Sequence, residues 1–403
     1  MKRKIKIGLL PRIAIAIALG IGLGWVSPMW FARLWATFNE VFGQLLGFLI
    51  PLIILGFVAP AIGDIGKSAG KMLVVTALLA YGATMMSGLI SYFTGNTFFP
   101  SMVSRTPTLE AVESGGAIEP YFTMPIPQMM PVMTALVFAF MLGLGIAYVK
   151  GETLKNTMDE FRDIVSMTIN VAIIPLLPFY IFGIFLNMTM IGQIGMILST
   201  FIKIIAIIFA LHIFILVLLY CIAALFVKKN PFKMLWTMMP AYFTALGTQS
   251  SAATIPVTLK QTIKMGVSED VAGFVVPLCA TIHMSGSTLK IVACALAIML
   301  MQGMPYTTGM FIQFIAMIGV TIIAAPGIPG GAIMASLGLL SSILGFNDAQ
   351  NALMIALYIA MDNFGTACNV TGDGALAQII NRFFAGKVKT ATPDPYPLAE
   401  ASE

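Results

Sequence analysis

Long apolar runs separated by short polar stretches account for most of the chain. A helix needs about 20 apolar residues to cross the hydrocarbon core of a membrane. Membrane-spanning β-barrels instead show alternating segments of about ten residues. The pattern therefore predicts an all-α polytopic membrane protein with eight transmembrane helices. The runs lie near residues 8–27, 39–62, 71–94, 131–149, 164–190, 199–227, 271–302 and 350–380.

Two further apolar stretches break on polar and flexible residues. They read TQSSAATIP at 248–256 and AAPGIPGG at 324–331, and their apolar flanks are too short for two full crossings each. Broken backbone at membrane depth is tolerated only where protein buries it or water lines it. Gly/Pro-interrupted apolar segments indicate the substrate site of a transporter. The sequence thus predicts a transporter with its substrate site at these two broken segments.

The composition excludes a soluble protein. Of the 403 residues, 59% are hydrophobic and 10% are charged, whereas soluble domains carry about 25% charged residues. The four cysteines lie singly in apolar stretches without CxxC spacing, so they indicate neither a metal site nor disulfides. We therefore expect no cofactor.

Basic residues cluster in alternate loops. By the positive-inside rule, both termini are cytoplasmic and the chain is a multi-pass protein of the cytoplasmic (inner) membrane. The formal net charge of +5 is then a signal of topology rather than of nucleic-acid binding, because the charges are dispersed among short loops. The residues on the predicted cytoplasmic side are Lys2, Arg3, Lys4, Lys6, Lys67, Lys71, Lys150, Lys155, Arg162, Lys228, Lys229, Lys233, Lys260, Lys264, Arg382, Lys387 and Lys389.

The last apolar run carries a polar stripe. Its four members recur at spacings of 4, 3 and 4, which puts them on one helix face. Ionisable residues within a span are costly and indicate function by default. The stripe predicts a face that lines an aqueous or ligand-filled cavity, and the alternative is a polar seam between helices. The four residues are Asp362, Thr366, Asn369 and Asp373.

Another apolar run is interrupted at residues 281–288, which read TIHMSGST. Gly286 lies between two serines, which favours local unwinding, and unwound carbonyl groups are ligands for cations. His283 and Lys290 add two ionisable groups to this region. His212, in a separate apolar run, is better explained by one structural hydrogen bond.

Four motifs occur in order along the chain: TQSSAATIP at 248–256, HMSGS at 283–287, GIPGG at 327–331 and NVTGD at 369–373. Together they resemble the hairpin tips, the NMDGT motif and the NVTGD motif of the glutamate transporter family, the dicarboxylate/amino acid:cation symporters. The resemblance covers nearly the whole chain and suggests a divergent prokaryotic member. It implies a homotrimer in the lipid bilayer, in which a transport domain slides against a static scaffold as an elevator. It also implies that the two broken segments are re-entrant helical hairpins, at about 231–264 and about 307–346.

The resemblance also divides the chain. It places scaffold helices 1–2 in residues 1–70, and an extracellular loop with scaffold helices 4–5 in residues 95–198. The transport domain comprises helix 3 at 71–94, together with helices 6, 7 and 8 and both hairpins at 199–386. Residues 387–403 form a cytoplasmic tail. The sequence assigns no site residue to the third helix.

By the same resemblance, Asp362 binds the amino group of the substrate, Asn369 holds its α-carboxylate and Thr366 contacts it. These pairings agree with the chemistry, because an ammonium group needs a carboxylate and a carboxylate suits amide and hydroxyl donors. The other substrate-binding positions that the resemblance implies are Gln249, Ser250, Ser251, Lys290, Ile328, Pro329, Gly330 and Gly365.

The chain departs from members that carry acidic substrates. Gln249 and Gly365 stand at the two places where such members have an arginine, so bidentate capture of a side-chain carboxylate is lost. We therefore predict a small or polar neutral L-amino acid as the substrate. The alternative is an acidic amino acid or dicarboxylate, bound by Lys290 as a point charge and coupled to Na⁺ or H⁺.

The sodium motif also differs. His283 and Ser285 replace the asparagine and aspartate of NMDGT, and a neutral imidazole is a poor ligand for Na⁺. We therefore predict a secondary active transporter with reduced or absent sodium coupling. The sodium ligands that the resemblance leaves in place are Asn369 and Asp373 for one site, and Thr281 and Met284 for another.

A protein-borne cation offers an explanation for this loss. We hypothesise that Lys290 or protonated His283 lies beside Asp373 and replaces a bound sodium ion, so that coupling is to protons or absent. Histidine titrates near neutral pH, which suits such a switch. The alternative is that His283 only accepts or donates a structural hydrogen bond and that sodium still couples through fewer sites.

Two other protein classes fit less well. A channel should show a repeated ring or filter motif, whereas two different hairpin tips favour a single occluded site. A membrane-embedded hydrolase needs a base for its serine, and no GxSG-like or HExxH element is present. The chain is therefore predicted not to be an enzyme.

Overall fold

The computed structural model describes residues 9–67, 71–103, 118–149, 151–192, 194–323 and 330–386. The predicted features at residues 1–8, at Ile328 and Pro329, and in the tail lie outside these ranges. Within them every regular element is a helix, as predicted. The helices are α1 (Leu9–Gly24), α2 (Met29–Lys67), α3 (Lys71–Phe98), η1 (Phe99–Ser101), α5 (Val132–Tyr148), α6 (Thr153–Thr168), η2 (Ile169–Ile173), α7 (Ile174–Met190), α8 (Ile194–Val227), α9 (Pro231–Thr237), α10 (Met239–Thr248), α11 (Ser251–Lys264), α12 (Glu269–Ile282), α13 (Ser285–Gln302), α14 (Thr308–Ile323), α15 (Gly331–Leu344), α16 (Asp348–Ala360) and α17 (Asp362–Phe384).

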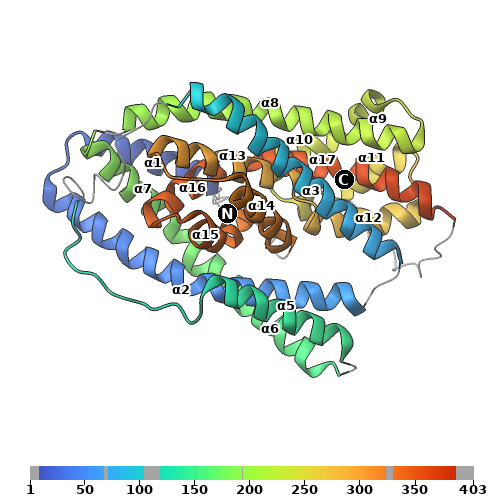
Figure 1. The fold of residues 1–403 in the computed structure, drawn as a ribbon, viewed down its shortest axis with the longest axis horizontal. Coiled ribbons are helices and arrows are strands. Elements are labelled where there is room, and N and C mark those ends of the chain that lie inside the picture. The colour runs from blue at the N-terminus through green and yellow to red at the C-terminus, as the bar shows by residue number, and fades with distance from the viewer. Residues whose placement is uncertain are drawn as a thin grey trace, which may run out of the picture.

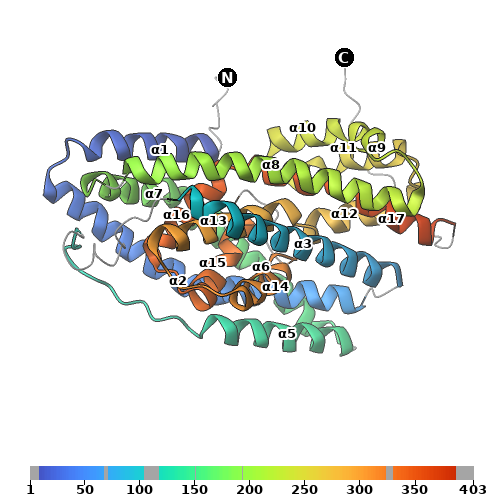
Figure 2. The same ribbon diagram turned by 45° about the horizontal axis from the view of Figure 1, so that its top comes forward.

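The helix α13 lies at the centre of the molecule. In both ribbon views α13 and α15 lie between α8 on one side and α2 on the other (Figures 1 and 2). α13 packs against α3, α8, α16 and α17. Nearly all of its residues are buried, including the polar ones. A helix that is enclosed on all sides needs an apolar surface all round, and the few polar groups on it need partners inside the protein.

Five described helices are long and apolar enough to cross a membrane, or six if the bent pair α16 and α17 counts as one span. The runs predicted at 8–27 and 131–149 become the shorter apolar helices α1 and α5, of 16 and 17 residues. A short helix spans only where the bilayer thins locally, where flanking residues snorkel to the interface or where the helix associates with others. The chain is thus a helical protein with several long apolar helices, and the number of eight spans stays a prediction.

Several helix pairs meet at short breaks. α10 ends at Gln249, whose φ of +54° is left-handed, and the Ser250 side chain then caps α11. α12 and α13 are separated by residues 283–284, and α16 and α17 meet at Met361 with a bend of 62°. Gly330, with φ of +79°, precedes α15. At each break the backbone leaves the helical conformation, so backbone groups at these breaks lack intrahelical partners.

Both predicted hairpins correspond to pairs of short helices. α10 packs against α11, and α14 packs against α15. Their ranges match the predicted limits of about 231–264 and about 307–346, if the short helix α9 is counted with the first. Whether these pairs are re-entrant depends on their depth in a membrane, which stays a prediction.

The unwinding predicted at Gly286 is wrong in position. α13 begins at Ser285, so Gly286 is helical and the break falls just before it. A Cβ atom at Gly286 would lie 2.6 Å from the carbonyl oxygen of Gly365 and 2.7 Å from Cβ of Cys368. The glycine is therefore required for the close approach of α13 to α17.

A testable consequence concerns α1 and α7. Gly20 and Gly24 on α1 pack against α7, and a Cβ at Gly20 would lie 2.7 Å from the carbonyl oxygen of Phe182. Small residues four positions apart allow such close helix packing. We expect Gly20→Val to lower the free energy of unfolding by roughly 1–3 kcal/mol through overpacking. The apparent melting temperature of the purified protein measures the change.

Gly22 provides the matched control, because its added Cβ would meet nothing within 4 Å. Gly22→Val should leave the melting temperature close to that of the wild-type protein. Equal losses in the two variants would show that helix propensity, and not the α1–α7 contact, sets the cost.

Candidate functional site

The polar stripe of the last helix is buried. The exposed fractions of Asp362, Thr366, Asn369 and Asp373 are 4%, 7%, 3% and 1%. All four lie on α17, which packs against α8, α10, α11, α12 and α13. The spacing predicted one shared face, and the surrounding helices cover that face. The stripe lies against polar groups of these helices, as the following contacts show.

Asp362 forms an ion pair with Lys290. The Lys290 Nζ atom lies 2.8 Å from Asp362 Oδ1, and Lys290 is completely buried. The same Nζ atom donates to the carbonyl oxygen of Met361 at 3.4 Å and lies 3.5 Å from the ring centroid of Tyr358. The ammonium group therefore has a carboxylate, a carbonyl and an aromatic face as partners, which together compensate for its loss of water.

Gly365 leaves the space that Lys290 fills. A Cβ atom at Gly365 would lie 2.8 Å from Lys290 Nζ and 2.9 Å from Cε. Any larger residue at this position would push the ammonium group away from Asp362. Gly365 and Lys290 thus form one unit, in which the lysine occupies the volume that a side chain on α17 would take.

The other Asp362 oxygen holds the second broken segment. Asp362 Oδ2 accepts a hydrogen bond from the backbone N–H of Gly330 at 2.8 Å. Ile328 and Pro329, predicted with Gly330 as a substrate-binding tip, lie outside the described residues. The described part of the tip is therefore fastened to the same carboxylate that pairs with Lys290.

Asp373 lies against His283. His283 Nδ1 lies 2.8 Å from Asp373 Oδ1, and its Nε2 lies 2.7 Å from Ser285 Oγ. An ionised carboxylate only accepts hydrogen bonds, so Nδ1 donates to Asp373. The Ser285 hydroxyl accepts from a charged imidazole or donates to a neutral one, so both hydrogen bonds survive in either state. Gly372 makes room, because its added Cβ would lie 2.6 Å from His283 Cε1.

The built-in cation hypothesis placed Lys290 or His283 beside Asp373. In the structure His283 contacts Asp373, whereas Lys290 contacts Asp362. Each buried carboxylate of α17 therefore has its own basic partner: His283 in the break between α12 and α13 for Asp373, and Lys290 on α13 for Asp362.

Asn369 caps the start of α13. Its Oδ1 accepts from the backbone N–H of Gly286 at 2.8 Å and of Ser287 at 3.4 Å. Its Nδ2 donates to Ser287 Oγ at 3.0 Å and approaches the sulfur of Met284 at 3.3 Å. The amide oxygen of Asn369 thus accepts from two N–H groups that the helix break leaves without intrahelical partners.

The first broken segment lies against α17 through α10 and α11. Ser251 is 8% exposed, while Gln249 and Ser250 are half-buried. The Ser250 side chain accepts from the backbone N–H of Ala253 at 3.3 Å. N–H groups at the start of a helix carry partial positive charge and suit a carboxylate.

The two residues predicted for a second sodium site, Thr281 and Met284, differ in their exposure to solvent. Thr281 is exposed and its hydroxyl donates to the carbonyl oxygen of Leu278 at 2.8 Å. Met284 is buried, and its backbone N–H donates to Thr84 Oγ1 at 3.3 Å. Across the part of the chain that the structure describes, no group of three or more His, Cys, Asp or Glu side chains surrounds a metal-sized space.

Sequence reasoning missed two contributors. α3 places Thr84, Ser87 and Ser91 in its buried face, and Ser91 Oγ donates to the carbonyl oxygen of Leu289 at 2.7 Å. The spacing of 3 and 4 between these hydroxyl residues was the available signal. Tyr358 was also missed, although it is a polar residue in the apolar helix α16, four positions before Asp362.

His212 makes the structural hydrogen bond that was predicted for it. Its Nε2 donates to the carbonyl oxygen of Gly286 at 3.1 Å. Its Nδ1 has no hydrogen-bond partner among the described residues. His212 therefore braces the first turn of α13 from α8 and does not touch either carboxylate pair.

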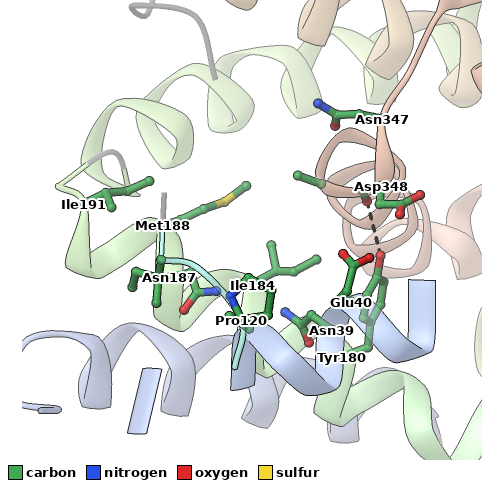
Figure 3. Close-up of a pocket in the computed structure, with 13 residues that line it drawn as sticks. Asn39, Glu40, Pro120, Tyr180, Ile184, Asn187, Met188, Ile191, Asn347 and Asp348 are labelled. Carbon is green, nitrogen blue, oxygen red and sulfur yellow. Dashed lines mark hydrogen bonds between the residues drawn. The ribbon is translucent and has the colours of Figure 1, made fainter. Parts of the chain in front are cut away.

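A cavity of about 360 Å³ lies apart from this cluster, between α2, α7 and the start of α16 (Figure 3). Figure 3 shows Glu40 and Asp348 at this cavity, and the Tyr180 hydroxyl donates to the Asp348 carbonyl oxygen at 3.2 Å. None of the predicted substrate or ion ligands lines this cavity. The predicted site residues are instead packed against one another.

Comparison with known proteins places the whole described helical region in one family. Residues 9–383 match the sodium:dicarboxylate symporter family. The chain is also similar to the serine/threonine transporter SstT of Acinetobacter baumannii, with 25% identity over 392 residues that cover 91% of this chain and 95% of that protein. These matches agree with the resemblance that the four motifs indicated, and they cover both broken segments and α17.

The His283–Asp373 contact predicts a cost for removing one partner. We expect His283→Leu to lower the free energy of unfolding by roughly 2–4 kcal/mol, because it leaves a buried carboxylate unpaired. Adding Asp373→Asn should recover part of that loss, because the remaining group is neutral. A double-mutant cycle of apparent melting temperatures measures the coupling. Additive losses would contradict a direct interaction in the folded protein.

Proposed function

The chain belongs to the sodium:dicarboxylate symporter family, and on that premise we propose that it carries a small or polar neutral amino acid across the cytoplasmic membrane with reduced or absent sodium coupling. Membership supports transport of a small molecule by a multi-pass membrane protein. The substrate, the coupling and the mechanism are the finer parts of the proposal. They are supported by the contacts of α17 and by the similarity to SstT.

The observation that carries the proposal is the pairing of both buried carboxylates with basic side chains of the protein. Sodium prefers hard oxygen ligands, and a carboxylate is the strongest of these. Here His283 Nδ1 already lies 2.8 Å from Asp373 Oδ1. Ser285, in place of a second carboxylate, hydrogen-bonds the same imidazole. A bound sodium ion would have to compete with both contacts, so weak or absent coupling follows.

The proposal of a neutral substrate is supported by the missing arginine and by the similarity to SstT. Gln249 and Gly365 supply no guanidinium for a second carboxylate of the substrate. SstT is named as a serine/threonine transporter, which is a substrate class of that size and charge. In this proposal Asp362 receives the substrate's ammonium group, while Asn369, Ser251 and the start of α11 receive its carboxylate.

The second candidate is an acidic amino acid or a dicarboxylate, coupled to Na⁺ or H⁺. It is favoured by the Lys290–Asp362 ion pair itself. Because Lys290 already neutralises Asp362, a substrate without an amino group leaves no charge unpaired there. Lys290 would then attract the substrate's extra carboxylate as a point charge.

The remaining features of the proposal follow the family resemblance. They are the homotrimer, the division into a scaffold and a transport domain at the predicted boundaries, the elevator motion and cytoplasmic termini. A channel is the competing mechanism, and saturable uptake distinguishes a carrier from it.

A binding screen distinguishes the candidate substrates. The purified protein is heated with each of the twenty amino acids and with succinate, in sodium salt and again in choline salt. A ligand that binds the folded state raises the apparent melting temperature by mass action. We expect L-serine or another small neutral amino acid to stabilise the protein equally in both salts. Stabilisation by succinate or aspartate alone would favour the second candidate, and stabilisation only in sodium would contradict the proposed loss of coupling.

Restoring the residues of the family's NMDGT motif should restore sodium binding. We expect the double variant His283→Asn with Ser285→Asp to bind sodium about tenfold more tightly than the wild type, the equivalent of about 1.4 kcal/mol. The added carboxylate supplies the missing hard ligand and the imidazole no longer competes for Asp373. Sodium titration of melting temperature and of uptake measures the change.

His212→Asn is the control for that variant, because His212 is also a buried histidine and contacts Gly286 instead of Asp373. It should leave the sodium dependence unchanged. If the double variant shows no gain over this control, His283 and Ser285 do not determine the ion coupling.

A further inference from the structure

The Lys290 ammonium group occupies the position that a substrate ammonium group would take on Asp362. Nζ lies 2.8 Å from Oδ1, and the other carboxylate oxygen is held by Gly330 N–H at 2.8 Å. The lysine side chain and an amino-acid substrate would thus both present an ammonium group to Asp362 Oδ1. A lysine in this position is a tethered competitor of the substrate.

The Lys290 ammonium group has further partners in the same pocket. Besides Asp362, its ammonium group contacts the Met361 carbonyl oxygen at 3.4 Å and the Tyr358 ring at 3.5 Å from the centroid. An ammonium group has three donors, so these two partners remain when Asp362 turns to a substrate. Tyr358 is itself fixed, because its hydroxyl lies 3.1 Å from Ser287 Oγ. The lysine can therefore yield Asp362 without leaving the pocket or becoming unpaired.

The charge of Asp362 makes Lys290 important when the carrier holds no substrate. A buried carboxylate without a counter-charge is strongly unfavourable in a low-dielectric site. In a carrier that binds an amino acid on Asp362, the substrate's ammonium group pairs with this carboxylate in the loaded site, and the empty site needs another cation there. Lys290 is completely buried and supplies that cation from within the protein.

We propose that Lys290 is a tethered counter-ion, which neutralises Asp362 in the empty carrier and so lets the unloaded site return across the membrane without a co-transported ion. This inference rests on the proposed function, because it needs a carrier that alternates between two sides. It makes Lys290 a residue that determines whether transport is net uptake or exchange. Gly365 contributes by leaving space for the lysine, and Tyr358 by holding it when the substrate is bound.

Two transport modes separate this role from a structural one. Net uptake requires the empty site to return, whereas exchange of internal for external substrate returns only loaded sites. The protein is reconstituted into liposomes, and radiolabelled L-serine is the probe in both assays. For Lys290→Met we expect net uptake to fall about 100-fold, the equivalent of about 2.7 kcal/mol in activation free energy. Exchange should persist, and the apparent affinity for L-serine should rise because the competitor is gone.

Matched variants test the charge itself. Lys290→Arg keeps a cation against Asp362 and should retain net uptake. Lys203→Met removes a lysine from the exposed face of α8 and should leave both modes unchanged. Serine-induced stabilisation of each variant in a melting assay shows that its site is folded.

The outcomes are distinct. Exchange without net uptake in Lys290→Met, with rescue by Lys290→Arg, supports the counter-ion role. Unchanged net uptake in Lys290→Met, or equal loss of both modes in a variant that still binds L-serine, overturns it. A variant that no longer binds L-serine would make Lys290 a structural or substrate-binding residue and also overturn it. If the wild-type protein shows neither mode with any compound of the binding screen, the proposed function fails and the counter-ion role falls with it.

Discussion

A carboxylate that is removed from water needs a compensating partner, and this requirement organises the centre of the molecule. α17 carries two such carboxylates, Asp362 and Asp373, which are 4% and 1% exposed. Both have basic partners, Lys290 on α13 and His283 in the break just before α13. These two contacts are short and each is supported by further hydrogen bonds, which is the condition under which such buried polar pairs are tolerated. The relative position of α13 and α17 therefore depends on them, and glycines at 286, 365 and 372 permit the approach.

The same stripe on α17 also satisfies the broken backbone around it. Asn369 accepts from the first N–H groups of α13, and Asp362 accepts from the N–H of Gly330 before α15. Orphan N–H groups at a helix start are expensive in an apolar surrounding, so such contacts fix the breaks in place. Under the proposed function, a substrate that binds to α17 replaces contacts that the protein makes with itself.

Under the same proposal, ion dependence is set by which cation neutralises the carboxylates of α17. A sodium ion, a substrate ammonium group and a protein side chain are alternatives for the same carboxylate charge. In this chain the side chains are covalently present and cost no binding entropy when they pair with the carboxylates. The Asp373–His283–Ser285 group keeps its hydrogen bonds in both protonation states of the imidazole, since the serine hydroxyl is both donor and acceptor. That property suits a carrier in which protons replace sodium or in which no ion is needed.

The sequence by itself determined the helical class, the two broken apolar segments and the polar stripe, because apolar run length and residue spacing act within one helix and need no neighbour. It also determined the family, through four motifs in order. The tertiary structure decided the pairing: Lys290 reaches Asp362 across 72 residues and His283 reaches Asp373 across 90. Contacts of Tyr358 and of the hydroxyl residues on α3 were likewise visible only in three dimensions. The physical reason is that periodicity fixes the face of a helix on which a residue lies, whereas the partner on the next helix depends on how closely and in which register the two helices pack.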